Sequence, residues 1–192
     1  MFKIVCFGDS LTEGYGAGWL FPVDRSKSYP AFLQSKVNAS VVNAGISGDT
    51  TSDALARLDT DVLSINPQMV IILLGTNDYF QRCPAAKAKA NLQEIIDRTR
   101  DGDRQLYLAS FIGDSNWETS LLDEIAGFLY SEYASLLSEY RKIFDELMSE
   151  NKDLHFIPNI WIGMQDTDMS DIIHPNASGY EKIAETIFDA IS

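Results

Sequence analysis

Residues 69–78 read MVIILLGTND, the most informative stretch of this sequence for its architecture. The first six residues are apolar without interruption, which is typical of a central parallel strand covered on both faces. Gly75 ends the apolar run, and the polar segment Thr76-Asn77-Asp78 follows at once. The stretch therefore predicts a buried strand with polar side chains at its carboxyl end.

Four other runs have strand length and apolar character: Phe2–Phe7, Ser40–Asn43, Gln105–Ala109 and Leu154–Ile157. Segments with helical periodicity lie between them. One helix is expected from Pro30 to about Val37, one after a Thr50 N-cap, and others across residues 88–99, 136–147 and 175–191. This alternation predicts a parallel sheet with right-handed crossovers and helices on both faces.

Size and composition indicate one globular domain over residues 1–192, since 45% of the residues are hydrophobic and 22% are charged. Lys and Arg number 15 against 28 Asp and Glu, which gives a net charge of −13. Residues 113–192 hold most of the acidic excess, with 4 basic and 16 acidic side chains. A chain with this charge repels polyphosphates and anionic lipid, so nucleic acid is not expected as a partner.

The two cysteines, Cys6 and Cys83, have neither the density of a disulfide framework nor the spacing of a metal site. Cys6 lies within an apolar strand run and is expected to be a small buried hydrophobe. The N-terminal residues lack the apolar core of a signal peptide, and no apolar stretch approaches the roughly 20 residues of a membrane span. These features predict a soluble, cytoplasmic protein.

Polar clusters follow four of the expected strands. They are Gly8-Asp9-Ser10-Leu11, the segment from Asn43 to Thr50, Gly75-Thr76-Asn77-Asp78, and Asp171-Ile172-Ile173-His174-Pro175. In a doubly wound sheet, ligands bind outside the carboxyl ends of the strands. We therefore expect these four clusters to meet at one edge of the sheet.

Ser10 is placed on a strand-to-helix turn, where a hydroxyl can be presented above the sheet. Of the two histidines, His155 lies inside the LHFI run and is expected to be a core or edge residue, whereas His174 precedes a proline on a loop. Asp171, three residues earlier, can accept the Nδ1–H of His174 and so direct Nε2 toward a serine. Ser10, His174 and Asp171 are thus candidates for a catalytic triad.

Acyl transfer also needs donors aimed at the developing oxyanion. Gly48 can bring its N–H close to a ligand, and Asn77 can offer a side-chain amide from the strand expected beside the first. Either residue alone would fit an ordinary turn. The four clusters in this order favour a hydrolytic site.

These blocks resemble those of the SGNH hydrolases, also called GDSL lipases and esterases, and the resemblance covers nearly the whole chain. It implies a three-layer α/β/α sandwich with a five-stranded parallel sheet in the flavodoxin-like order 2-1-3-4-5. It also implies that Ser10 is the nucleophile, that His174 and Asp171 complete the triad, and that Ser10, Gly48 and Asn77 form the oxyanion hole. No metal or organic cofactor is expected. Within the family, the loops look most similar to the bacterial thioesterase I, lysophospholipase L1 and arylesterase branch.

The expected function is hydrolysis of small carboxylic esters or thioesters through an acyl-Ser10 intermediate. Two alternatives stay open: a carbohydrate or cell-wall O-acetylesterase with the same residues, and a non-catalytic flavodoxin-like module that binds phosphate or flavin. Asp9 and Glu13 in the first loop disfavour the second alternative because they would repel an anion.

Aromatic side chains near the expected site are candidates for lining an acyl cleft. Tyr79 and Phe111 are predicted to contact substrate, and the wider set comprises Trp19, Phe21, Phe80 and Trp117. Residues 111–127 form the longest irregular stretch, for which a lid beside the site and a solvent-exposed excursion are both open.

Overall fold

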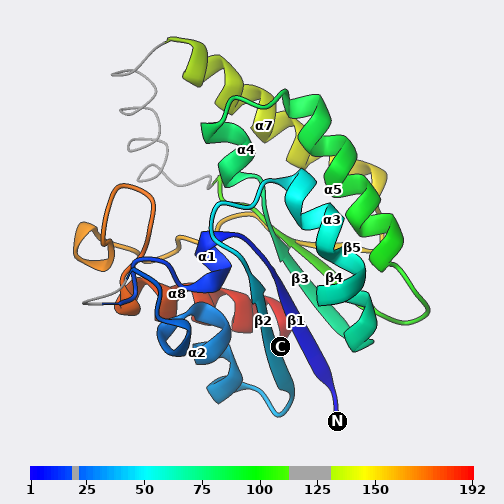
Figure 1. Ribbon diagram of the computed structural model, residues 1–192, viewed down its shortest axis with the longest axis vertical. Helices are drawn as coiled ribbons and strands as arrows, with labels where there is room; N and C mark the ends of the chain where they lie inside the picture. Colours follow the sequence, from blue (N-terminus) through cyan, green and yellow to red (C-terminus); the bar gives the residue numbers. More distant parts are fainter. Residues whose placement is uncertain (19–21, 113–130) are drawn as a thin grey trace.

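The computed structural model describes residues 1–18, 22–112 and 131–192, without the side chains of residues 131–134. One five-stranded sheet has the order β2-β1-β3-β4-β5, and every neighbouring pair is parallel (Figure 1). The strands are β1 (Lys3–Gly8), β2 (Ser40–Gly45), β3 (Met69–Leu73), β4 (Gln105–Ala109) and β5 (Leu154–Ile157). The predicted fold class and strand order are confirmed.

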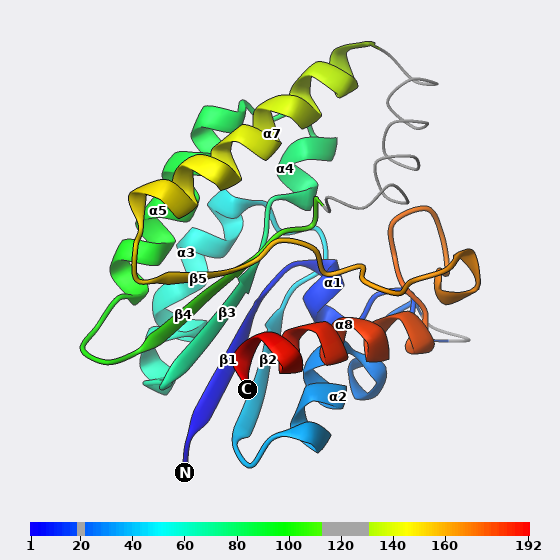
Figure 2. The same ribbon diagram turned by 180° about the vertical axis from the view of Figure 1, so that it is seen from behind.

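Helices cover both faces of the sheet. On one face, α2 (Tyr29–Lys36) packs with α8 (Ala177–Ile191), and on the other lie α3 (Thr51–Asp61), α5 (Ala85–Thr99) and α7 (Ser131–Glu150), as the two opposite views show (Figures 1 and 2). Shorter elements occupy the loops: α1 (Ser10–Glu13), α4 (Thr76–Phe80), η1 (Arg25–Lys27), η2 (Leu63–Ile65) and η3 (Asp166–Asp168). None of the helices in the described parts of the chain has the length and apolarity needed to cross a bilayer.

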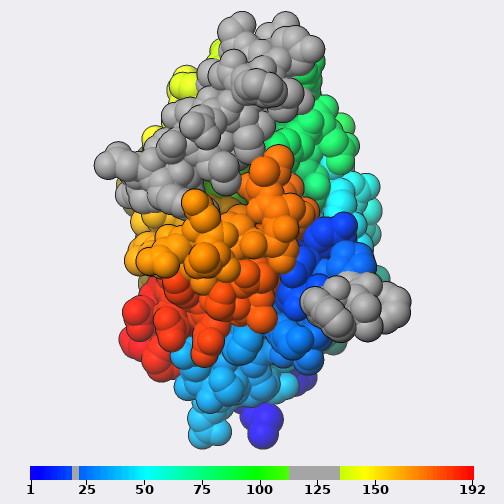
Figure 3. Space-filling model, turned by 90° about the vertical axis from the view of Figure 1, so that its left-hand side faces the viewer, coloured from blue at the N-terminus to red at the C-terminus, as the bar shows by residue number. Residues whose placement is uncertain are grey.

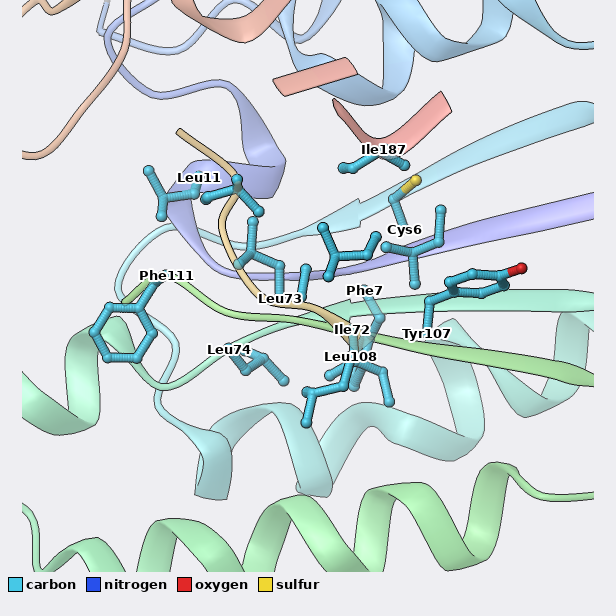
Figure 4. Close-up of a cluster of buried hydrophobic side chains, with 14 of the residues drawn as sticks. Cys6, Phe7, Leu11, Ile72, Leu73, Leu74, Tyr107, Leu108, Phe111 and Ile187 are labelled. Atoms are coloured by element: carbon cyan, nitrogen blue, oxygen red, sulfur yellow. The ribbon is translucent and has the colours of Figure 1, made fainter. Parts of the chain in front are cut away.

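Strand β3 lies inside the core, and all five of its residues are buried. Its neighbour β1 carries Cys6 and Phe7, both fully buried in the cluster that includes Leu73, Leu108 and Ile187 (Figure 4). Cys6 is therefore the small buried hydrophobe that the sequence predicts. Burial raises the pKa of its thiol to about 12, so the thiolate does not form at neutral pH.

Local sequence signals account for most helix boundaries. The hydroxyl of Thr50 accepts from the N–H of Asp53, whose carboxylate accepts in turn from the N–H of Thr50, so a capping box begins α3. Helix α8 begins later than predicted, because Asn176 and not Pro175 caps it, accepting from the N–H groups of Ser178 and Gly179.

His155 lies exposed on the edge strand β5, where its ring stacks on Tyr107 at a centroid distance of 4.7 Å. The interpretation of His155 as an edge residue is confirmed, and the ring is distant from the carboxyl ends of β1 and β3.

Side chains form hydrogen bonds with backbone groups along the free edge of β2. The Gln34 amide donates to the carbonyl of Ala39 and accepts from the N–H of Val41, each over 2.8 Å. Arg25 donates to the carbonyls of Asn43 at 3.1 Å and Gly45 at 2.8 Å. These bonds replace part of the ladder that a sixth strand would form.

The carboxyl ends of the three strands β1, β2 and β3 lie at the same level. Gly8, the last residue of β1, is opposite Gly45 of β2 on one side and Leu73 of β3 on the other. Helix α1 then packs directly onto the end of β2: a Cβ at Gly45 would lie 2.7 Å from the carbonyl carbon of Thr12 and closer still to the N–H of Glu13. Only glycine permits this approach.

We expect Gly45→Ala to destabilise the protein by about 3 kcal/mol or more, because backbone cannot move aside as a flexible side chain can. Gly102→Ala is the matched control, since its Cβ would meet nothing within 4 Å and its φ of +56° costs only about 1 kcal/mol. Urea unfolding of both variants measures the difference. Equal losses of stability would contradict the tight α1–β2 contact.

Candidate active site

Ser10 is the first residue of α1, and Asp9 alone separates it from the end of β1. Asp9 caps this helix, its carboxylate accepting from the N–H of Leu11 at 3.0 Å. The phenol of the buried Tyr180 on α8 donates to the carbonyl of Tyr15 at 2.6 Å and approaches that of Ser10 at 3.4 Å. Ser10 is largely buried, 6% exposed, and lies on a firmly held segment.

The loop before α8 brings His174 to Ser10 across 164 residues of sequence. Nε2 of His174 lies 3.1 Å from Oγ of Ser10, and Nδ1 lies 2.8 Å from Oδ2 of Asp171. Asp171 also accepts from the N–H groups of Ile173 at 2.9 Å and His174 at 2.8 Å. Figure 3 shows the region of this loop (orange) against the N-terminal segment (dark blue). The structure thus brings together the three side chains that the sequence singled out.

The ionisation of Asp171 determines the direction of these hydrogen bonds. Partial burial opposes ionisation, but the bonds from the N–H of Ile173 and from His174 together lower the pKa of Asp171. A carboxylate can only accept, so Nδ1 of His174 carries a proton, and when the ring holds one proton, Nε2 is left to accept from the Ser10 hydroxyl. Tyr15 packs against this imidazole with ring centroids 4.4 Å apart.

A hydrogen bond from Asn77 to Asp49, the residue after Gly48, connects the two predicted oxyanion donors. The Asn77 amide, in the first turn of α4, donates to the carbonyl of Asp49 at 2.9 Å. Gly48 is exposed, has a φ of +88° and faces open space. Among residues 1–18, 22–112 and 131–192, no hydrogen bond uses the N–H of Gly48 or of Ser10. Both N–H groups are therefore available to a ligand.

A protein-family model, described as the GDSL-like Lipase/Acylhydrolase family, matches residues 6–182. The chain belongs to this family. It is an ester hydrolase.

Two curated relatives of this GDSL hydrolase span almost all of it. An arylesterase of Vibrio mimicus is 28% identical over 96% of this chain and 86% of its own length. The thioesterase 1/protease 1/lysophospholipase L1 of Escherichia coli strain K12 is 28% identical over 95% of this chain and 79% of its own. A solved structure, the lipase/acylhydrolase from Enterococcus faecalis, has a TM-score of 0.74 and 26% identity, covering 100% of this chain and 95% of that one. The resemblance drawn from the sequence blocks is confirmed.

Tyr79 and Phe111 belong to an aromatic cluster beside the site of this GDSL hydrolase. They are 1% and 2% exposed, and both contact Tyr140, with Phe111 also against Phe144. Their observed partners are core side chains, so their contact with substrate stays a prediction. Trp19, Phe21 and Trp117 lie outside the described residues, as does most of the 111–127 stretch, for which a lid and a solvent-exposed excursion were both open.

Several residues that organise the site were missed by sequence reasoning. Arg57 on α3 donates to the carbonyls of Gly8 at 2.8 Å and Ala44 at 2.9 Å and pairs with the carboxylate of Asp49. It thereby ties two strand ends to the loop that holds Gly48. A single arginine on a helix gives no pattern that would reveal this position. Glu13 was considered only for the charge that it adds to the first loop, and Tyr15 was not considered.

Asp9 is a buried carboxyl directly before Ser10. Its Oδ2 makes no well-formed hydrogen bond among the described residues, although the hydroxyl of Thr76 is near. Burial raises the pKa of Asp9 to about 7; the N–H of Leu11 and the Thr76 hydroxyl act against this, while the charges of Asp78 and Asp49 add to it. Asp9 is therefore largely protonated below neutral pH. Nowhere in the described chain do three or more His, Cys, Asp or Glu side chains form a group suited to a metal ion.

The raised pKa of Asp9 predicts a pH-dependent stability. Unfolded, Asp9 loses its proton near pH 4, whereas the folded protein retains it until about pH 7, so folding is favoured at low pH and this contribution is lost as the pH rises. Asp9→Asn mimics the protonated form. The unfolding free energy of the wild type relative to this variant should fall by up to about 4 kcal/mol between pH 4 and pH 8.

Urea unfolding at several pH values checks this, with Asp153→Asn as the control. Hydrogen bonds from Arg100 lower the pKa of Asp153, so its contribution has the opposite sign and is lost as the pH falls. A pH dependence of Asp9→Asn identical to that of the wild type would show that folding leaves the pKa of Asp9 unchanged.

Proposed function

We propose that this GDSL hydrolase cleaves acyl esters and thioesters through a covalent intermediate on Ser10, with His174 as general base and Asp171 as its partner. The observation that carries the proposal is the continuous chain of contacts from Ser10 Oγ to His174 Nε2 at 3.1 Å and from His174 Nδ1 to Asp171 Oδ2 at 2.8 Å. Both distances are within the range of a general base and the group that orients it.

In the first step, His174 Nε2 takes the proton of Ser10 as Oγ attacks the carbonyl carbon and the carbonyl electron pair moves onto oxygen. Asp171 stabilises the imidazolium that results. The tetrahedral intermediate collapses, the bond to the alcohol or thiol breaks, and the leaving group takes the proton from Nε2. An acyl-Ser10 ester is left on the enzyme.

In the second step, water gives a proton to His174 and attacks the acyl carbon. Collapse of this intermediate releases the carboxylic acid, and Ser10 regains its proton from the imidazolium. Throughout, we assign the N–H groups of Ser10 and Gly48 and the amide of Asn77 as donors to the oxyanion. Each donor of this kind contributes roughly 3–4 kcal/mol to transition-state stabilisation.

Ser10→Ala should lower kcat by at least about 10⁴-fold, because the covalent route is lost and only binding and the oxyanion donors are left. A fluorophosphonate probe followed by peptide mapping should label Ser10 alone. Ser149→Ala is the control, since that exposed hydroxyl bonds only within its own helix, to the carbonyl of Glu146. A label on another residue, or full activity in Ser10→Ala, would refute the assignment.

Substrate class is tested with p-nitrophenyl acetate, p-nitrophenyl octanoate, an octanoyl thioester and acetylated sugars. We expect the octanoyl ester and the octanoyl thioester to be hydrolysed in addition to p-nitrophenyl acetate. Activity confined to acetyl groups on sugars would favour the O-acetylesterase with the same triad.

A further inference from the structure

The oxyanion glycine lies in a turn whose central peptide bond can take two orientations. In the four-residue turn Ile46-Ser47-Gly48-Asp49, here called the 46–49 turn, the N–H of Asp49 donates to the carbonyl of Ile46 at 3.2 Å. Gly48 in the third position has a φ of +88°, whereas Ser47 has no positive φ. These values are the signature of a type II turn.

The Gly48 N–H belongs to the central peptide of this turn. In a type I turn the same peptide is rotated by about 180°, and the third residue takes a φ near −90°. Glycine tolerates both conformations, so its own preference does not select one. The direction of the Gly48 N–H is therefore set by the groups that hold the residues on either side of it.

Glu13 holds the residue before Gly48. Its Oε2 accepts from both the N–H of Ser47, at 2.8 Å, and the hydroxyl of Ser47, at 2.5 Å. Since Glu13 ends the short helix that Ser10 begins, these bonds connect the serine segment directly to the 46–49 turn. On the other side of Gly48, Arg57 binds the carboxylate of Asp49.

Arg25 compensates the charge of Glu13. Its guanidinium lies 2.7 Å from Oε1 of Glu13 and donates to the carbonyl of Gly45 at 2.8 Å. Partial burial acts against ionisation, but the bonds from Ser47 and Arg25 lower the pKa of Glu13. The carboxylate is thus a permanent acceptor near neutral pH, and the ion pair reduces its repulsion of a developing oxyanion.

We propose that Glu13 is a positioning residue that holds the 46–49 turn in its type II form, with the Gly48 N–H directed at the oxyanion. The inference rests on the proposed function, because it assumes that Gly48 is an oxyanion donor. A purely structural role for Glu13 would affect unfolding and leave the chemistry of folded enzyme intact.

The test compares Glu13→Ala, Glu13→Gln and wild type in three measurements: kcat and KM for p-nitrophenyl acetate, the Ki of phenylboronic acid, and thermal unfolding. A boronic acid forms a tetrahedral adduct on the serine oxygen and so reports on the oxyanion site. Asp153→Ala is the matched control, since it removes an exposed ion pair with Arg100 on another part of the molecule.

For Glu13→Ala we expect kcat to fall about 10-fold to 100-fold, below the limit for complete loss of one oxyanion donor, with KM changed less than about twofold. The Ki of the boronic acid should rise by the same factor as kcat falls. Glu13→Gln should recover part of kcat, because its amide oxygen can accept both Ser47 bonds, although its NH2 group cannot accept from Arg25 as Oε1 does. Asp153→Ala should match wild type in kcat and Ki.

The proposal would be overturned if folded Glu13→Ala had the kcat and Ki of the wild type, or a lower kcat with an unchanged Ki. It would also be overturned if Glu13→Gln were as impaired as Glu13→Ala. If Glu13→Ala does not fold, Ser47→Ala is measured in its place. Paired changes in kcat and Ki would support the positioning role of Glu13, and unchanged values would refute it. Ser10→Ala distinguishes failure of the proposed function from failure of the proposed role of Glu13. Full activity of Ser10→Ala would refute the proposed function. An inactive Ser10→Ala together with a fully active Glu13→Ala would refute only the role of Glu13.

Discussion

The site depends on the register of three parallel strands. β1 pairs with β2 and β3 so that Gly8 lies opposite both Gly45 and Leu73. Because the three strands end at one level, the loops that follow them begin side by side. A shift of register by one residue would turn every side chain of a strand to the opposite face of the sheet and move these loops apart. The continuously apolar β3, held between β1 and β4, makes such a shift costly.

Carboxyl groups around Ser10 occupy environments that favour different protonation states. Asp171, bonded to His174 and to backbone N–H groups, is ionised, whereas the buried Asp9 keeps its proton up to about neutral pH. Glu13 is ionised but paired with Arg25. Of these three carboxyl groups, the two that carry a charge are Asp171, which is bonded to His174, and Glu13, which is paired with a guanidinium. Such a separation of environments lets several acids share one site without mutual interference.

Periodicity and the polar blocks at strand ends are local signals, and they predicted the parallel sheet and the meeting of Ser10, His174 and Asp171. The strand order came from the resemblance to the GDSL family. The sequence did not predict the contacts of Arg57 or Glu13, since each bonds to partners that only the folded loops bring near. The surroundings of Phe111 could not be predicted for a related reason: an aromatic in a loop looks the same in sequence whether it faces a cleft or packs on Tyr140. Long-range packing of single residues leaves no periodic trace.

The free edge of β2 has a consequence for behaviour at high concentration. Unpaired strand edges are templates on which a second molecule can add its own strand, the first step toward aggregation. Here the amide of Gln34 and the guanidinium of Arg25 occupy backbone groups of Ala39, Val41, Asn43 and Gly45 along that edge. An incoming strand would have to displace both side chains before it could bond there. The arginine that pairs with Glu13 thus also protects the protein against edge-to-edge self-association.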